Sequence, residues 1–506
     1  MKIAAVQSRF AGYGRAFAAT VAAGMLLANP TAAEAEPWAT PGDLSLRQDI
    51  ELLADTGLIN LPVTSWPMSW GDIFRSVQQV ELKESMSLSV THALERVRTR
   101  ARAETFNGLP QLEYGVSAAE SPRRLRLFED SPRENGQLNL AVAHTWESVS
   151  ARVEFTYAFN ARDNREYRFD GSYVSLVWGN TTFTLGAQER WWGPGYDGAL
   201  ALSTNARPVP AFAIKRNFSD PFESRWLRWL GPWTGSFFIG QMESNRGVPK
   251  PYLVGGRVAI KPLSSLELGL VRTAQWGGEG RDESFDSFFD LLIGRDNVGD
   301  GVDRANEPGN QLAGFDWRWR VFGGEQPIVF YGQLIGEDEA GGFPSRYLGQ
   351  LGLSTSTPVG QNGARLDAHV EFSDTTCQFY ESSKLFNCAY NNSLFPNGYR
   401  YRDRPIGHST DNDARQVAVG ASLRTRNDAR YSASVRYSEL NRGGSPDLGN
   451  ALSPVPSDLI NVELSHERDW FGGIVTVGVG IDAASGQVGG LDGNDVRGFV
   501  EWKNRY

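Results

Sequence analysis

Most of this chain repeats one pattern, in which apolar and polar residues alternate over short segments. Within 149–159, for example, Val153 stands on an apolar face and Arg152 on a polar one, and 364–372 and 431–437 repeat the alternation. Segments of about ten residues that are apolar on one face only are typical of strands in an outer-membrane β-barrel. Counting them predicts an all-β transmembrane barrel of about 18 antiparallel strands.

A large soluble sandwich or propeller also has alternating strands. Here, however, the polar faces carry charges in strand after strand, which suits a wet lumen better than a second packed sheet. The last residues agree, because Val500, Trp502 and Tyr506 share one face and Tyr506 ends the chain. A final strand that ends in an aromatic residue resembles the signal read by the outer-membrane barrel assembly machinery. Outer-membrane lipid and this machinery are therefore expected partners.

The first 35 residues predict a cleavable secretory signal peptide. Lys2, Arg9 and Arg15 precede the short apolar stretch 16–28, and Ala33-Glu34-Ala35 has the small residues that signal peptidase accepts. The alternative is an uncleaved anchor, but thirteen apolar residues are too few to span a bilayer as a helix. We expect export to the bacterial outer membrane.

The charge of the chain excludes one class of partner. The full sequence carries −9, and removal of a leader with three basic residues and Glu34 leaves −11. A nucleic-acid-binding protein would show a basic excess, so no nucleic acid is expected as a partner. An acidic polymer could bind only through a local cluster of Arg and Lys.

Residues 36–105 differ from the rest and predict a small helical plug domain, followed by a barrel over 106–506. Asp43 or Ser45 can cap a helix that Gly57 ends, and further helices are expected around 73–77 and 87–104. Such a domain has too little core to be stable alone, so we expect it to pack against the barrel on its periplasmic side. Tight turns are expected at 180–181 and 427–428, and long outer loops at 274–308, 374–413 and 483–494.

The most distinctive block is 189–210, ERWWGPGYDGALALSTNARPVP. It resembles the Wzi family of outer-membrane capsule-assembly proteins, which have a WWGPG turn followed by an SNARP-like segment; here Thr204 stands where Asn is frequent. The resemblance extends to Pro41-Gly42-Asp43, Leu46-Arg47 and Trp66-Pro67, and to YRYRDRPIGHSTDNDA at 399–414.

The resemblance implies an eighteen-stranded barrel with a helical bundle that plugs or braces it. It also implies a lectin-like protein without enzyme activity or cofactor, which binds capsular polysaccharide and supports capsule assembly at the cell surface. The alternative function is a porin-like channel for solutes or polysaccharide, since such a barrel is wide enough for an open lumen.

Aromatic rings stack on sugars, and arginine forks bind carboxylates, so two groups are candidates for polysaccharide binding. They are Arg190, Trp191, Trp192 and Arg207, and Tyr399, Arg400, Tyr401, Arg402 and Arg404. The first group has a structural alternative, in which the tryptophans anchor a barrel rim and the arginines pair with lumen acids. For the second group, in an expected outer loop, both readings stay open.

Three other motifs give less information about function. Cys377 and Cys388 are the only cysteines, and because an exported protein meets oxidising conditions they predict a local disulfide; the alternative is two free thiols. Two cysteines alone cannot build a tetrahedral zinc site. His408-Ser409 suggests a hydrolase, yet adjacent residues do not make a catalytic triad. The acidic run at 296–303 lacks the glutamate of an EF-hand loop, so no metal site is expected.

Overall fold

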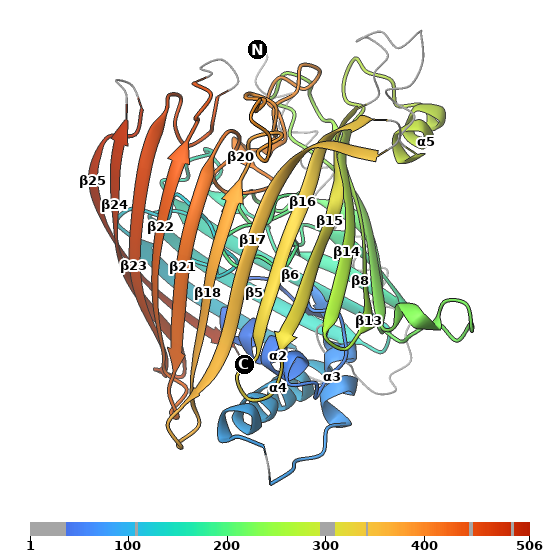
Figure 1. The fold of residues 1–506 in the computed structure, drawn as a ribbon, viewed down its shortest axis with the longest axis vertical. Helices are drawn as coiled ribbons and strands as arrows, with labels where there is room; N and C mark the ends of the chain where they lie inside the picture. Colours follow the sequence, from blue (N-terminus) through green and yellow to red (C-terminus); the bar gives the residue numbers. More distant parts are fainter. Residues whose placement is uncertain are drawn as a thin grey trace, which may run out of the picture.

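The computed structural model describes residues 37–84, 86–106, 110–293, 309–340, 343–444, 449–486 and 490–505. The expected signal peptide at 1–35, the acidic run at 296–303 and Tyr506 lie outside these residues. Figure 1 shows a barrel with helices below it and irregular loops above it. We call these two ends of the barrel the helical end and the loop end.

Antiparallel strands close into one barrel, as predicted. The first and last strands meet at the seam, where Phe499 lies opposite Ala119 and Arg505 opposite Glu113. In the described part of the chain β7 and β8 both pair with β6 and share one of eighteen positions around the barrel. The fold class expected from the alternation is therefore confirmed.

The first strands of the barrel are β4 (Gln111–Ala119), β5 (Gly136–Trp146), β6 (Val149–Phe159), β7 (Tyr167–Arg168), β8 (Tyr173–Trp178), β9 (Thr181–Gly186), β11 (Ala211–Arg216), β12 (Trp233–Gln241) and β13 (Tyr252–Leu263). The others are β14 (Leu266–Trp276), β15 (Gly309–Phe322), β16 (Ile328–Ala340), β17 (Phe343–Val359), β18 (Ala364–Asp374), β21 (Arg415–Arg424), β22 (Arg430–Leu440), β23 (Ser457–Trp470), β24 (Gly473–Gly486) and β25 (Gly493–Arg505).

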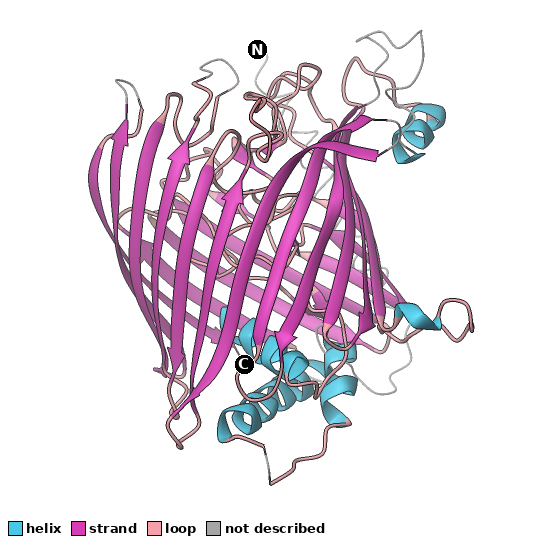
Figure 2. Cartoon of the chain, viewed as in Figure 1, coloured by secondary structure: helices cyan, strands magenta, loops and turns pink. Residues whose placement is uncertain are grey.

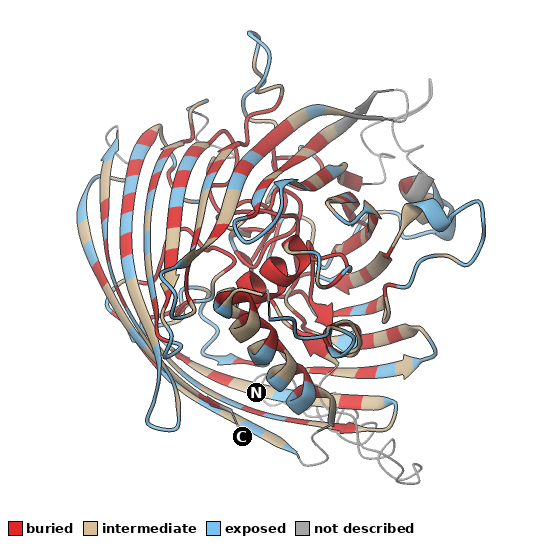
Figure 3. Ribbon diagram, turned by 60° about the horizontal axis from the view of Figure 1, so that its bottom comes forward, coloured by how far each residue is buried: buried red, intermediate tan, exposed pale blue. Residues whose placement is uncertain are grey.

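The two faces of the wall have opposite chemistry. Val153 and Val370 point outward and are 56% and 50% exposed, whereas their neighbours Arg152 and Glu371 point into the lumen. Figure 3 shows the resulting alternation of buried and exposed residues along the strands. An apolar outer band and a charged interior are what a strand needs to separate lipid from a polar lumen.

The helices precede the barrel in the chain. They are α2 (Leu44–Asp55), α3 (Trp70–Gln78) and α4 (Leu88–Phe106). The short strand β1 (Trp38–Ala39) precedes α2, and β2 (Ser65–Trp66) and β3 (Met68–Ser69) lie between α2 and α3. Asp43 caps α2, since its carboxylate accepts a hydrogen bond of 2.8 Å from the backbone N–H of Leu46. No described helix has the length and apolar character needed to cross a membrane.

Ion pairs fix α2 inside the helical end of the barrel. Asp55 accepts hydrogen bonds of 2.5 and 2.7 Å from Arg318 on β15, and Asp49 accepts one of 2.6 Å from Arg365 on β18. Glu267 on β14 also accepts hydrogen bonds from the backbone of the chain after α2. The helices thus complete their core against the barrel, which explains how so short a segment can be ordered.

The connections are mostly as expected in kind. Tight turns link β8 to β9 and β21 to β22, and long segments join β14 to β15 and β18 to β21. The expectation of a long loop at 483–494 is wrong, because β24 runs to Gly486 and β25 begins at Gly493. The apolar pattern fades there, at Ala483 and Ala484, but backbone pairing continues opposite Asn494 and Gly493.

Two connections were not anticipated. The chain between β11 and β12, 217–232, contains the 3-10 helix η1 (Arg228–Leu230) and lies at the helical end, to the lower right in Figure 1. At the loop end, α5 (Phe285–Ile293) follows β14.

Loops fill the interior of the barrel. Figure 2 shows loop segments crossing the space between the strands. Segment 187–210 contacts the helical part of the chain, because β10 (Trp191–Trp192) pairs with β2, and segment 375–414 packs on it from the loop end. Their shared core includes Leu200, Tyr390 and Tyr399. These two segments, called the inner segment (187–210) and the outer segment (375–414), carry the candidate residues.

Candidate functional site

The paired tryptophans lie deep in the lumen. Trp191 and Trp192 are 0% and 1% exposed, and they pair with Trp66 and Ser65 of β2. Trp192 packs on the Phe238 ring of the wall, with 5.4 Å between ring centres. In this arrangement neither indole has a face free for a sugar, and both hold the inner segment in place.

The turn after the tryptophans requires glycine because two segments approach closely. A Cβ atom on Gly198 would lie 2.0 Å from the ring of His408 in the outer segment. Arg47 of α2 donates hydrogen bonds to the Pro194 and Gly195 carbonyls, at 2.5 and 2.8 Å. The WWGPG turn therefore contacts α2, and Gly198, three residues after the turn, contacts the outer segment.

Charged residues below this turn are paired. Asp197 accepts hydrogen bonds of 2.5 Å from Arg436 and 2.7 Å from His369. Burial alone would raise the pKa of Asp197, but the Arg436 guanidinium and the contact with His369 outweigh it and hold that pKa below its usual range. Asp197 is thus hydrogen-bonded to two residues of the wall, beside a second pocket that Asp197, His369 and Arg436 line.

Arg207 is also paired. Its guanidinium donates hydrogen bonds of 2.6 Å to Asp163 and of 2.6 and 2.9 Å to Asp170. Both acids belong to the connection between β6 and β8, so Arg207 ties this connection to the inner segment. The arrangement matches the structural alternative, in which a lumen arginine pairs with acids.

The first residues of the group 399–404 are buried as well. Tyr399 is 0% exposed and donates a hydrogen bond of 3.0 Å to the Ala201 carbonyl. Arg400 grips Asp411 with two hydrogen bonds of 2.8 and 2.9 Å, and Tyr401 is 4% exposed. Tyr399 thus holds the outer segment onto the inner one, and Arg400 joins two parts of the outer segment.

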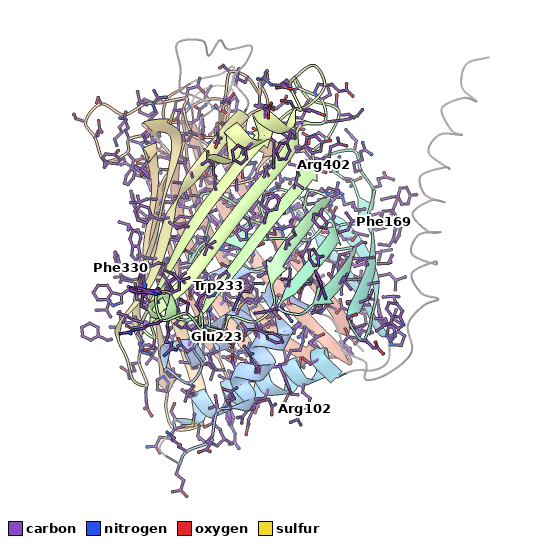
Figure 4. The ribbon with its side chains drawn as sticks, turned by 90° about the vertical axis from the view of Figure 1, so that its right-hand side faces the viewer. Arg102, Phe169, Glu223, Trp233, Phe330 and Arg402 are labelled. Atoms are coloured by element: carbon purple, nitrogen blue, oxygen red, sulfur yellow. A yellow bond between two sulfur atoms is a disulfide. The ribbon has the colours of Figure 1, made fainter. Side chains whose placement is uncertain are left out.

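Arg402 and Arg404 are different because both are partly exposed. They belong to a hairpin of β19 (Arg400–Tyr401) and β20 (Arg404–Pro405), which turns at Arg402 and Asp403 with positive φ angles of 51° and 64°. Arg402 lies at the loop end in Figure 4, far from Arg102 on α4. A turn at this position can present a cationic side chain to solvent.

Arg404 lies among other arginines. It donates a hydrogen bond of 3.1 Å to the Asn205 side chain, which is neutral. Burial lowers the pKa of Arg404 to about 9, with further contributions from Arg126, Arg133 and Arg162. These three cations come from loops that the sequence did not single out, although Arg123, Arg124, Arg126 and Arg133 form a visible basic run between two strands.

Arg190 is the most unusual of the candidates. Its guanidinium lies over the Phe238 ring at 4.5 Å, donates 3.0 Å to the Gln188 carbonyl and has no carboxylate partner among the described residues. Burial lowers the pKa of Arg190 to about 10. A pocket beside it brings together Arg190 and Arg207, and Gln188, Glu189, Ser203 and Thr204 also line it.

His408 and Ser409 do not form a hydrolytic pair. Both are buried, His408 Nδ1 lies 2.7 Å from the Thr410 hydroxyl, and Ser409 Oγ has no hydrogen-bond partner among the described residues. Burial lowers the pKa of His408 to about 4, so the ring is neutral at pH 7. The geometry gives the hydrolase alternative no support.

Cys377 and Cys388 are joined by a disulfide bond. It closes a short loop at the start of the outer segment, next to Tyr390 and Ala389 of the shared core. Tyr380 and Phe386, within this loop, are 57% and 44% exposed. The bridge therefore stabilises a small surface lobe at the loop end.

Comparison with known proteins places the chain in a family. The model of the capsule assembly protein Wzi family matches residues 113–488. An uncharacterized 55.8 kDa protein in the cps region of Klebsiella pneumoniae is 32% identical over 407 residues, which cover 79% of this chain and 77% of that protein.

A solved structure agrees over nearly the whole length. It is that of Wzi, an outer-membrane protein involved in group 1 capsule assembly in Escherichia coli and described as a carbohydrate-binding β-barrel. The identity is 26%, the TM-score is 0.80, and the match covers 92% of this chain and 99% of that one. The chain therefore belongs to the Wzi family of capsule assembly proteins.

Proposed function

We propose that this protein is a lectin-like component of the bacterial outer membrane that binds capsular polysaccharide and supports capsule assembly and attachment at the cell surface. The observation that carries the proposal is the family match over residues 113–488. The carbohydrate-binding barrel from Escherichia coli, similar over 92% of this chain, supports the same function. Binding is the proposed activity, and no catalytic step is assigned.

We orient the barrel with its loop end outward. In outer-membrane barrels short turns face the periplasm and long loops face the outside. The helices of 36–105 then lie on the periplasmic side, and the apolar outer band contacts membrane lipid. Export by a signal peptide at 1–35, and recognition of a C-terminal Tyr506 by the barrel assembly machinery, complete this proposal.

The arginines at the loop end suit an acidic polymer. Arg126, Arg133, Arg162 and Arg404 are close enough to affect one another, although the chain as a whole is acidic. Clustered guanidinium groups attract carboxylates and bind them with two parallel hydrogen bonds. Arg402 and Arg404 are partly exposed on the β19–β20 hairpin at the loop end, and we propose them as contacts for the polymer.

The filled lumen favours binding over transport. The inner segment, the outer segment and α2 occupy the interior, and ion pairs such as Asp55–Arg318 and Asp197–Arg436 fix them to the wall. A porin-like pore would need these pairs to open. We therefore place the channel second.

The proposal is tested by measuring polysaccharide in a deletion strain and its complemented partner. We expect the deletion to shift polysaccharide from the cell-attached to the shed fraction and complementation to restore it. An unchanged distribution would refute an attachment role. Planar-bilayer recordings of the purified protein would separate the alternatives, since an open channel would give stable conductance steps.

A further inference from the structure

The pocket beside Arg190 lies between the inner segment and the barrel wall. Phe238 of β12 and Leu253 of β13 form its apolar side, and Gln188, Arg190 and Ser203 contribute polar groups. Gln188 and Arg190 are two residues apart in the stretch without regular secondary structure that follows β9, and both line the pocket.

Two donors in this lining have no partner within the described protein. They are Nε2 of Gln188 and Nη2 of Arg190, and both residues are more than nine-tenths buried. A buried donor without an acceptor is costly, and a charged one more so. Two such atoms on residues that line one pocket point to an acceptor that binds beside them.

The other polar groups of the lining are already engaged. Ser203 donates a hydrogen bond of 2.5 Å to the Gly407 carbonyl, and Thr204 donates one of 3.3 Å to the Leu127 carbonyl. Glu189, the acidic residue of the lining, pairs with Arg133 at 2.9 Å, and Arg207 is held by Asp163 and Asp170. The free donors are therefore those of Gln188 and Arg190.

The charge of Arg190 is also unbalanced, in contrast to other buried arginines of this barrel. Arg400 is paired with Asp411, and Arg257 with Asp316, each through hydrogen bonds of 2.9 Å or less. A buried cation of this kind is stabilised by an anion that brings its own acceptors. A carboxylate supplies both, with two oxygens for the two donors.

We propose that this pocket, which is lined by Gln188 and Arg190, binds the carboxylate of an acidic sugar residue, with one oxygen accepting from Arg190 and the other from Gln188. The inference rests on the proposed polysaccharide-binding function and specifies its substrate class. The carboxylate can belong to a uronic acid or to a pyruvate ketal, which present the same group.

The test uses the full-length protein in detergent micelles and ligand-observed NMR titration. The probes are methyl β-D-glucuronide, the 4,6-pyruvate ketal of methyl β-D-galactoside, and methyl β-D-glucoside as the neutral reference. We expect the wild type to prefer at least one acidic glycoside about tenfold over the neutral one, as loss of a charged hydrogen bond predicts. The glycoside that is preferred identifies the source of the carboxylate.

Arg190→Gln should abolish that preference. Arg216→Gln is the matched control, because Arg216 also stacks on an aromatic ring, Trp233 at 4.0 Å, and donates to carbonyls at the other end of β11. Gln188→Leu removes the second donor without a change of charge and should weaken the preference. It is the substitute test if Arg190→Gln does not fold. Folding is checked by heat-modifiable migration in SDS gels.

The outcomes separate the two proposals. Absence of any preference in the wild type, or its retention in Arg190→Gln, would overturn the carboxylate site. Polysaccharide purified from the source strain serves as a second probe. Equal binding of this polymer by the wild type and Arg190→Gln would leave the proposed function standing without the pocket, whereas no binding by the wild type would contradict the proposed function itself.

Discussion

Arg400 and Asp411 form a buried ion pair with two nearly equal hydrogen bonds of 2.8 and 2.9 Å. The pair joins the β19–β20 hairpin to the chain that leads into β21, and Asn391 adds a third hydrogen bond to the guanidinium, at 2.8 Å. Both side chains are at most 10% exposed. The pair therefore sets the position at which Arg402 and Arg404 reach the loop end.

Asp411→Asn should loosen the outer segment without opening the barrel. The substitution leaves a buried guanidinium unpaired, which typically costs about 3–5 kcal/mol. Limited proteolysis of the folded protein should then cut within 375–414 much faster than in the wild type. Asp403 is an exposed acid of the same hairpin, so the Asp403→Asn variant should be cut at the wild-type rate. Equal cleavage rates for all three proteins would contradict the role of Asp411 in holding the outer segment.

Loss of Asp55 should weaken the seal at the helical end. Asp55→Asn removes the charge that balances Arg318 on the wall, at a cost of about 3 kcal/mol for a buried pair. We expect transient conductance steps in planar bilayers where the wild type gives none. Asp220→Asn breaks an exposed pair with Arg75 and should leave the recordings unchanged. A silent Asp55→Asn would mean that other contacts close the lumen.

The outer segment should lose stability in acid because of His408. Burial lowers the pKa of His408 to about 4, below the value of an unfolded histidine. The unfolded segment therefore binds a proton that the folded one does not. The contribution of His408 to stability falls as pH drops from about 6.5 towards 4, by up to about 3 kcal/mol.

Hydrogen exchange of 402–414 at pH 7 and pH 4.5, corrected for the intrinsic rate, measures this effect. His408→Gln should show a smaller acid-induced loss of protection than the wild type. Burial also raises the pKa of Asp413, to about 6, which favours the folded segment as the pH falls. Asp413 is present in both proteins, so the difference between them isolates His408. Identical pH profiles would contradict the assignment.

Arg404→Gln should weaken binding of acidic polysaccharide several-fold and leave folding intact. Arg404 is partly exposed and donates a hydrogen bond to the neutral side chain of Asn205, so its loss breaks no ion pair of the described structure. Lys250→Gln is a suitable control, because Lys250 is an exposed cation at the same end, paired with Glu279. Binding is measured at two salt concentrations, since the Arg404 contribution should shrink as salt rises. An unchanged affinity would remove Arg404 from the site.

The wall could be predicted because its signal is local. Alternate residues such as Arg152 and Val153 face the lumen and the lipid, and this period of two is written into each strand regardless of its neighbours. The end of β24 was missed because Ala483 and Ala484 carry little apolar signal, although their backbone pairs with β25. Pairing partners distant in the chain decide such boundaries.

The site was harder to predict because its geometry depends on segments far apart. Trp191 and Trp192 suggest a rim or a sugar platform by composition, and only their pairing with Trp66 and Ser65, more than a hundred residues earlier, buries them. The environment of Arg190 is equally hidden in the sequence, because its neighbours along the chain do not show that it lacks an acidic partner in the fold. Residue type identified the candidates, and tertiary contacts show which of them are buried structural residues and which remain available to a ligand.

The pairing of β2 with β10 has a mechanical consequence. A force applied to the β19–β20 hairpin passes through Asn205 to the inner segment, and from Trp191 to Trp66 and the helices at the opposite end. Under the proposed function, tension on a bound polymer would be shared between the wall and a second, internal path of hydrogen bonds. A cell that held its capsule through such a barrel could resist shear because the force on the loop end would also be carried by the helices at the helical end.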